Sequence, residues 1–254
     1  MPPITIEYSE AGVAILRLCD PDNENALTTE FCSAWLDSMH CLAPDSELRV
    51  LVIAGLPKVF CSGASTATLE MLSSGSFDVR DLELPDRILS FPVPVIAAME
   101  GHAVGGGLVA ALCCDLVIAA SEKRYGLNFT ELGFTPGMGI TGLLPALAGH
   151  HLAAEMLLTG RFFQGDELVR RGLFNAAVPS TEVFALSLDL ARQLKSKPRH
   201  VLEMTKSALA EPRRAILAKA MSREHLMHRI CFSPQSGAVR EEVFLATGGS
   251  HHDS

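Results

Sequence analysis

Nearly uninterrupted apolar runs of strand length alternate with helical patterns in the first half of the chain, and this alternation constrains the fold most. Residues 49–54, 94–99 and 114–119 are such runs, which is typical of strands buried on both faces. Residues 28–42 place apolar side chains at helical spacing, and Thr28 is suited to cap that helix. The alternation favours an α/β domain with a largely parallel sheet that is covered on both faces.

The two ends of the chain depart from this pattern. Residues 4–8 and 13–18 predict a β-hairpin with its turn at residues 10–12. After about residue 138 the strand signals fade, and we predict that the remainder is helical. The expected helices are residues 143–149, 151–158, 166–171, 182–195, 198–209 and 213–232.

Composition indicates a globular protein and excludes some partners. Of the 254 residues, 48% are hydrophobic, so the chain collapses rather than staying disordered. The formal net charge of −8 argues against nucleic acid as a partner, because phosphate binding needs a basic footprint. Seven cysteines, an odd number without C-x-x-C spacing, are interpreted as reduced thiols in a cytoplasmic protein.

No membrane, metal or cofactor is expected. The N-terminus lacks the basic and apolar segments of a secretory signal. The apolar residues 103–114 fall short of the roughly 20 needed to span a bilayer, and we expect a buried helix there. The adjacent His251 and His252 are interpreted as incidental rather than as a metal site.

Two glycine-rich turns each follow a predicted strand and precede a helix. They are residues 60–65 (FCSGAS) and residues 101–108 (GHAVGGGL). Glycine is costly inside a helix, and three at its N-terminus make sense where backbone amides approach a ligand closely. If each turn offers one N–H to the same oxygen, the pair forms an oxyanion hole. The alternative is that the glycines serve close packing of the helix.

Four segments carry a family resemblance: residues 60–64, 94–107, 114–115 and 132–139. They resemble the signatures of the enoyl-CoA hydratase/isomerase, or crotonase, superfamily, in register over nearly the whole chain. The resemblance implies a crotonase-like (ClpP/crotonase) spiral of ββα units over residues 1–190 and a helical trimerisation region over residues 191–254. It also implies a thioester substrate whose carbonyl oxygen is held by the amides of Ala64 and Gly106.

The departures from that pattern concern the two catalytic carboxylates of the hydratases. Val109 and Phe129 stand at their positions. Hydration needs a base that deprotonates water and an acid that protonates carbon, so we expect no hydration of an enoyl thioester by the usual route. Glu131 is two residues away, and it reaches the Phe129 position only with a local rearrangement.

An oxyanion hole without a protein base suits decarboxylation, because the departing carboxylate supplies the electrons. The sequence is similar to the decarboxylating branch of polyketide β-branching cassettes, which implies 3-methylglutaconyl thioester on an acyl carrier protein going to 3-methylcrotonyl thioester. The substrate-binding residues expected on this basis are Ala26, Ser65, Thr66, Thr68, Leu108, Val109, Phe129 and Phe134. Some relatives in that branch have a lysine in the lid that meets the substrate carboxylate, but residues 65–77 contain no lysine. Arg80 or Arg87 are alternatives for this contact. Both lie in residues 73–87, which we predict to be a mobile lid or loop.

A histidine on the C-terminal helix is a further feature of that branch. His228 is our candidate for the proton donor, because it shares a helix face with Leu217, Met221 and Glu224, and Glu224 is placed to orient or charge the ring. The alternative is a structural histidine at a trimer contact. His225 lies on a different face, and His102 is interpreted as structural.

Three functions remain open at this point. The first is the decarboxylase, and the second is another crotonase-fold lyase or a Δ3-Δ2 isomerase that acts on coenzyme A thioesters with Glu131 as its base. The third is a non-catalytic chain that binds acyl thioesters. A carrier protein would be acidic, and the candidate docking residues are Arg80, Arg87, Lys123, Arg124, Lys195, Lys197 and Arg199. We expect a homotrimer or a dimer of trimers.

Overall fold

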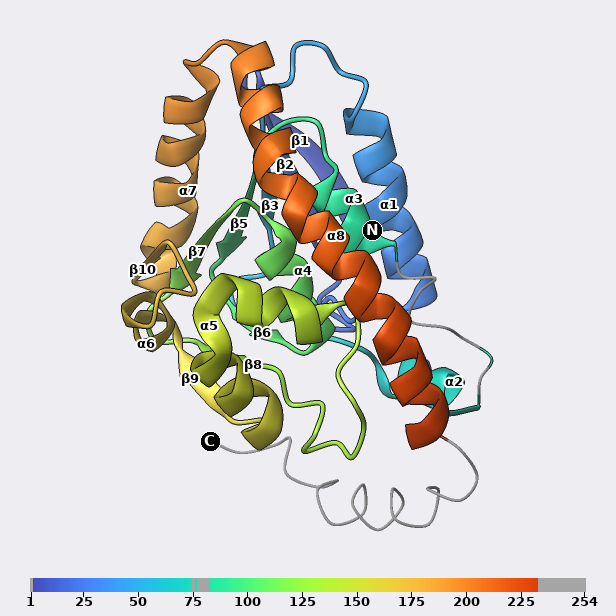
Figure 1. Cartoon of the computed structure of the whole chain (residues 1–254). Coiled ribbons are helices and arrows are strands. Elements are labelled where there is room, and N and C mark those ends of the chain that lie inside the picture. Colours follow the sequence, from blue (N-terminus) through green and yellow to red (C-terminus); the bar gives the residue numbers. More distant parts are fainter. Residues whose placement is uncertain (1, 75, 77–82, 233–254) are drawn as a thin grey trace.

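The computed structural model describes residues 2–74, 76 and 83–232, and its strands form two sheets (Figure 1). The larger sheet has the order β1 (Ile4–Glu10), β2 (Val13–Leu18), β3 (Val50–Ala54), β5 (Val95–Met99), β7 (Leu116–Ala120) and β10 (Ala176–Val178). The smaller sheet has the order β4 (Val59–Cys61), β6 (His102–Val104), β8 (Arg124–Gly126) and β9 (Phe162–Gln164). The pairs β1–β2 and β8–β9 are antiparallel, and the other pairs are parallel.

Eight helices are described. They are α1 (Thr29–Leu42), α2 (Thr66–Ser74), α3 (Leu84–Leu89), α4 (Gly106–Cys113), α5 (Ile140–Thr159), α6 (Gly165–Arg170), α7 (Ser180–Lys195) and α8 (Arg199–Cys231). Thr28 caps α1 as predicted, because its hydroxyl accepts from the Phe31 N–H. No helix in these described ranges combines the length and hydrophobicity of a transmembrane span.

A strand–strand–helix unit repeats along the chain, as the resemblance implies. The units are β3-β4-α2, β5-β6-α4 and β7-β8-α5. In each unit the first strand enters the larger sheet and the second enters the smaller one. The ends of successive strands are therefore stacked beside one another, and the turns that follow them meet.

Alternate side chains of the larger sheet enter two different cores. Val50 and Val52 face α7, whereas Leu51 and Ile53 face the opposite side, where α1, α3 and α4 contribute buried side chains. Both faces are apolar, which explains why the strand sequences show continuous apolar runs. α8 packs against α3 and α5 and runs diagonally across the view in Figure 1.

Several predicted elements need correction. The two helices expected at 198–209 and 213–232 are one continuous helix, α8, with Pro212 inside it. Buried residues on both sides of the proline, Ala210 and Leu217, hold the helix to the core and override the local break. We also missed the five strands β4, β6, β8, β9 and β10, each of three residues, which are too short to show a period.

Other expectations lie outside the described residues or are untested. Arg80, His251 and His252 fall outside them, as does much of the predicted lid (73–87). The described ends of the lid are helical rather than loops, because residues 73–74 end α2 and residues 84–87 begin α3. The division at residue 190 stays a prediction, and it falls within α7.

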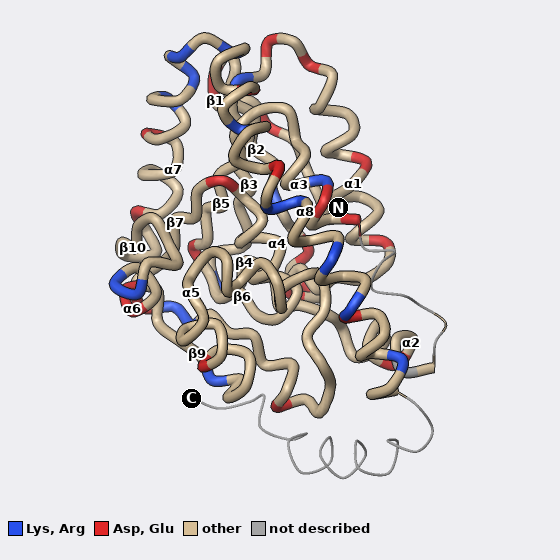
Figure 2. The backbone as a smooth tube through the Cα atoms, in the orientation of Figure 1, with Lys and Arg blue, Asp and Glu red and all other residues tan. Residues whose placement is uncertain are grey.

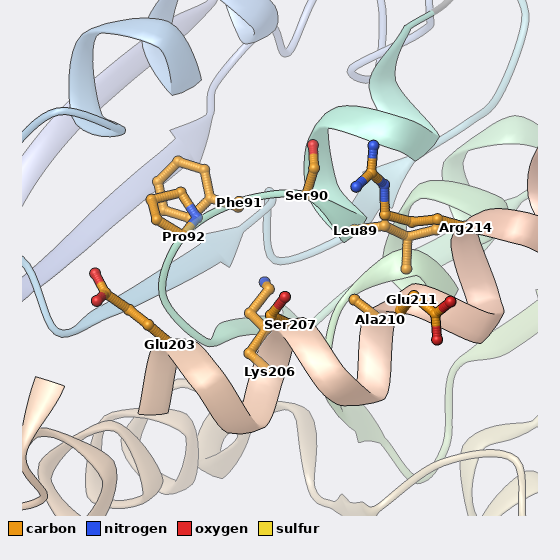
Figure 3. A pocket seen from close by; sticks show the side chains of 10 residues that line it. All are labelled: Leu89, Ser90, Phe91, Pro92, Glu203, Lys206, Ser207, Ala210, Glu211 and Arg214. Carbon is orange, nitrogen blue, oxygen red and sulfur yellow. The ribbon is translucent and has the colours of Figure 1, made fainter. Parts of the chain in front are cut away.

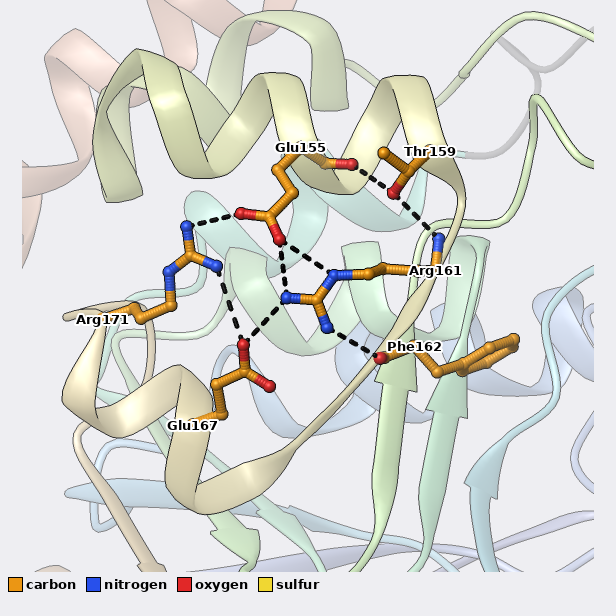
Figure 4. A network of polar contacts seen from close by, with 6 residues as sticks. All are labelled: Glu155, Thr159, Arg161, Phe162, Glu167 and Arg171. Atoms are coloured by element: carbon orange, nitrogen blue, oxygen red, sulfur yellow. Dashed lines mark hydrogen bonds and ion pairs between the residues drawn. The ribbon is translucent and has the colours of Figure 1, made fainter.

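A polar network fastens β9 and α6 to the end of α5 (Figure 4). Arg161 bonds the carboxylates of Glu155 at 2.6 Å and Glu167 at 2.9 Å, and Arg171 bonds Glu155 at 2.6 Å. The Arg161 guanidinium also stacks 3.6 Å from the centre of the Phe163 ring. The network anchors the C-terminal end of α5, the helix whose other end borders the candidate site.

Candidate active site

The two glycine-rich turns lie in direct contact. Parallel pairing of β4 with β6 brings their ends together. Gly63 has a φ of +88°, and a Cβ atom there would lie 2.8 Å from the Val104 carbonyl oxygen and 3.5 Å from the Gly106 nitrogen. A Cβ atom on Gly107 would lie 2.5 Å from the Cys61 carbonyl oxygen. Glycine is therefore required at both positions, by conformation at Gly63 and by close approach at Gly107.

The amides of Ala64 and Gly106 border this contact. Gly106 is the first residue of α4, where a backbone N–H has no partner within the helix and the helix dipole is positive. Among the described residues, neither the Ala64 nor the Gly106 N–H donates to a backbone carbonyl. The structure thus brings the two turns together, and the oxyanion hole formed by their amides stays a prediction.

The loop before α1 supports the first turn. The Leu27 N–H donates to the Gly63 carbonyl at 2.8 Å, and the buried Asn25 amide donates to the carbonyls of Leu18 and Phe60. Ala26, a predicted substrate-binding residue, is buried in this loop. Sequence reasoning missed Asn25, because a single amide side chain in a loop gives no periodic signal.

Ser65 and Thr68 hold the backbone rather than facing open space. The Thr68 N–H donates to the Ser65 hydroxyl, which caps α2. The two hydroxyls lie 2.9 Å apart, and the Thr68 hydroxyl donates to the Leu27 carbonyl. Thr66 is exposed at the start of α2.

An apolar wall lies beside the second turn. Leu108 and Val109 are fully buried, and the Phe129 ring lies next to Gly105, where a Cβ atom would be 3.9 Å from its Cε1. The Phe129 and Phe134 rings pack edge to face, 5.9 Å apart. Residues 101–114 carry no Lys, Arg, Asp or Glu, and residues 125–148 carry only Glu131 (Figure 2). This side of the site therefore offers little charge.

Glu131 does not turn into this wall. It is exposed, and its side chain lies on Gly160 at the end of α5, where a Cβ atom would be 2.5 Å from the Glu131 Cγ. The Glu131 side chain is thus exposed and lies against Gly160, whereas Val109 is fully buried.

His228 lies at the far end of a row of rings that starts beside Gly105. The Phe134 ring is 6.0 Å from that of Phe232, which is 5.7 Å from the His228 ring. The His228 Nε2 lies 2.8 Å from the Thr135 carbonyl oxygen. A carbonyl only accepts, so we assign a proton to Nε2.

Glu224 has a role that differs from the predicted one. Its Oε2 accepts from the Gly139 N–H at 2.6 Å, and its Oε1 accepts from the N–H and hydroxyl of Thr141 at 2.8 and 2.7 Å. The carboxylate caps α5, a role that the sequence did not predict. Burial raises its pKa, against the lowering effect of these hydrogen bonds.

Two other groups near the turns are structural. The His102 Nδ1 accepts from the Arg124 N–H at 2.9 Å, which confirms its structural interpretation, and burial lowers its pKa. Burial raises the pKa of the Cys61 thiol to about 12, so the thiol stays protonated and is not an active nucleophile.

A separate pocket lies between α8 and the segment at residues 89–92 (Figure 3). Its volume is about 320 Å³, and the predicted site residues are not among those that line it. Lys206 points its amine to the carboxylate of Asp115 at 2.8 Å and to the carbonyls of Ile88 and Val93. The amine is committed to holding α8 on the core.

Several cations of the candidate docking surface are already paired. Arg87 bonds Glu83, Lys195 bonds Glu10 and Arg199 bonds Glu203. Arg124 lies over the Phe162 ring.

Comparisons with known proteins agree with the fold. The family model for enoyl-CoA hydratase/isomerase matches residues 8–243. The bacillaene synthase decarboxylase PksI of Bacillus subtilis (strain 168) is 32% identical over 223 residues, which cover 88% of this chain and 90% of that protein. The crotonyl-CoA hydratase of Syntrophomonas wolfei is 33% identical and is covered over 92% of its length by 93% of this chain.

Among solved structures, one from a dehydratase/decarboxylase enzyme couple involved in polyketide beta-branching superposes with a TM-score of 0.91. It is 30% identical and covers 97% of this chain and 100% of that chain. The superposition confirms the predicted crotonase-like α/β fold. The family match and these relatives together lead to one conclusion: the chain belongs to the enoyl-CoA hydratase/isomerase family.

Proposed function

We propose that this protein decarboxylates 3-methylglutaconyl thioester, carried on an acyl carrier protein, to 3-methylcrotonyl thioester. The observation that carries the proposal is the apolar wall beside the second turn, where Val109 is fully buried and the Phe129 ring lies next to Gly105. The family resemblance implies that these two residues stand where the hydratases have their catalytic carboxylates. The decarboxylases among the relatives support it, whereas the hydratase relatives support only the family.

The chemistry needs no protein base. The bond between C4 and the carboxylate breaks, carbon dioxide leaves, and its electron pair forms the C3–C4 double bond. The former C2–C3 pair moves to C1–C2, and the carbonyl pair moves to oxygen. The amides of Ala64 and Gly106 stabilise this dienolate oxygen, at about 3 kcal/mol per donor. Protonation at C4 by His228 then gives the 3-methylcrotonyl product.

Parallel incubations with three thioesters test the reaction class. With 3-methylglutaconyl thioester we expect the mass of carbon dioxide to be lost. With crotonyl thioester we expect no gain of water, and with a Δ3-enoyl thioester no shift of the double bond, since Glu131 lies on Gly160. Shift of that bond, abolished by Glu131→Gln, would establish the isomerase instead. No turnover of any of the three would favour the non-catalytic chain.

Restoring the two carboxylates should hinder the reaction. In the double variant Val109→Glu, Phe129→Glu, negative charge lies near the departing carboxylate, and we expect decarboxylation to fall by at least tenfold. The same substitutions bury charge, so folding is checked by circular dichroism and thermal melting. A folded double variant that decarboxylates at the parent rate contradicts the placement of these two side chains.

Docking of the carrier protein is proposed to use the cations outside the described ion pairs. Lys123, Arg124 and Lys197 are the candidates, because Arg87, Lys195 and Arg199 bond carboxylates. We expect turnover of the carrier-bound substrate to fall with added salt more steeply than turnover of the pantetheine thioester. Equal salt dependence of the two substrates would remove this docking surface.

A homotrimer, or a dimer of trimers, is part of the same proposal. α8 exposes large apolar side chains, among them Met204, Leu209 and Leu226, and Leu158 on α5 is 76% exposed. Side chains of this size gain from burial against another subunit.

A further inference from the structure

α5 begins without a cap of its own. Its N-cap residue is Gly139, which has no side chain and sits at a φ of +81°. The first N–H groups of a helix need acceptors, and here they are supplied by Glu224, 85 residues later in the chain. The beginning of α5 is thus held from α8.

The residue before that cap is strained. Met138 has a φ of +62°, a left-handed conformation that is unfavourable for a residue other than glycine. Such a conformation persists only where its surroundings fix it. The Gly139 N–H, the next amide along the chain, is the one that bonds Glu224 at 2.6 Å.

Met138 in turn lies directly on the second glycine turn. A Cβ atom on Gly106 would be 2.8 Å from the Met138 sulfur and 2.7 Å from the Leu27 Cδ1. Gly106 is therefore clamped between two side chains, and one of them depends on the turn that Glu224 holds.

Two further contacts from α8 hold residues 133–139, the loop that leads into α5. The His228 Nε2 contacts the Thr135 carbonyl at 2.8 Å, and the Cys231 sulfur contacts the Gly133 carbonyl at 3.5 Å. α8 therefore fixes both ends of residues 133–139, the loop that lies between the proposed proton donor and the proposed oxyanion amide.

We propose that Glu224 is a positioning residue: by capping α5 from α8, it holds Met138 against Gly106 and sets the direction of the Gly106 N–H. Its catalytic consequence rests on the proposed function, but the coupling from Glu224 to Gly106 does not.

The variant Glu224→Gln tests this inference. The glutamine keeps one accepting oxygen but turns an NH2 group toward a backbone N–H, so one end of the cap is lost. We expect faster hydrogen–deuterium exchange at residues 137–142 and also at residues 104–109. With the proposed substrate we expect kcat to fall about 10- to 100-fold, with a smaller change in KM, since small misplacements near the chemistry have effects of this size.

Glu211→Gln is the matched control, because Glu211 is exposed on the same helix and lines the separate pocket. It should change neither exchange nor kcat. A double-mutant cycle with Met138→Ala adds a second readout: if Glu224 acts through Met138, the two effects on kcat are strongly non-additive.

The outcomes separate the two claims. Faster exchange at residues 137–142 but unchanged exchange at 104–109 would overturn the coupling, as would additive effects in the cycle. Coupled exchange in a protein that decarboxylates nothing would leave the coupling intact and refute the proposed function.

Discussion

Replacement of His228 by alanine is expected to slow decarboxylation by about 10²–10⁴-fold, which is the usual contribution of general acid catalysis. The variant removes the proposed proton donor, and it also removes the contact of Nε2 with the Thr135 carbonyl that helps to hold residues 133–139. His228 is the titratable side chain at the end of the ring row that begins beside Gly105. The rate of product formation from the carrier-bound substrate is the measurement.

His225→Ala is the control, since His225 lies on a different face of α8, and we expect little loss. A structural role of His228 predicts something else, namely a lower melting temperature with the parent rate in the folded fraction. If the His228→Ala protein is folded and forms the same product at the parent rate, water or another group delivers the proton.

Gly63→Ala is expected to lower kcat about 10²–10³-fold, the loss typical of one oxyanion donor. The methyl group would lie 2.8 Å from the Val104 carbonyl and would force the two turns apart. The Ala64 amide follows directly in the chain and would move with it. Stability should also fall, since a φ of +88° disfavours alanine.

Gly172→Ala separates the two effects. Gly172 has a φ of +78°, and nothing lies within 4 Å of a Cβ atom built there. This variant should lose stability through backbone strain alone and keep its rate. A Gly63→Ala protein that loses stability but keeps kcat would show that the Ala64 amide does not bind the oxyanion.

The sequence predicts the long strands well, because burial on both faces requires apolar residues at every position. Val50–Ala54 and Val95–Met99 are apolar at every position, which identifies them as strands. The three-residue strands show no such apolar run, and β4 and β6 are recognisable only by their pairing in the smaller sheet. The contact of the two glycine turns depends on that pairing.

Site residues divide in the same way. The glycine-rich turns can be recognised from their composition, and the replacement of both carboxylates can be recognised from the motifs. Glu224 shares a helix face with His228, but its partners, Gly139 and Thr141, come from another helix. Spacing along α8 gives no information about these partners, so the capping of α5 could not be predicted from the sequence.

A single-turnover reaction of 3-methylglutaconyl carrier protein in deuterium oxide, followed by mass spectrometry of the thioester, distinguishes decarboxylation from hydration. We expect loss of carbon dioxide and gain of one deuterium at C4, because the dienolate is protonated there after the carboxylate has left. A thioester that keeps its carboxylate, or that gains water across the double bond, would contradict the proposed decarboxylation.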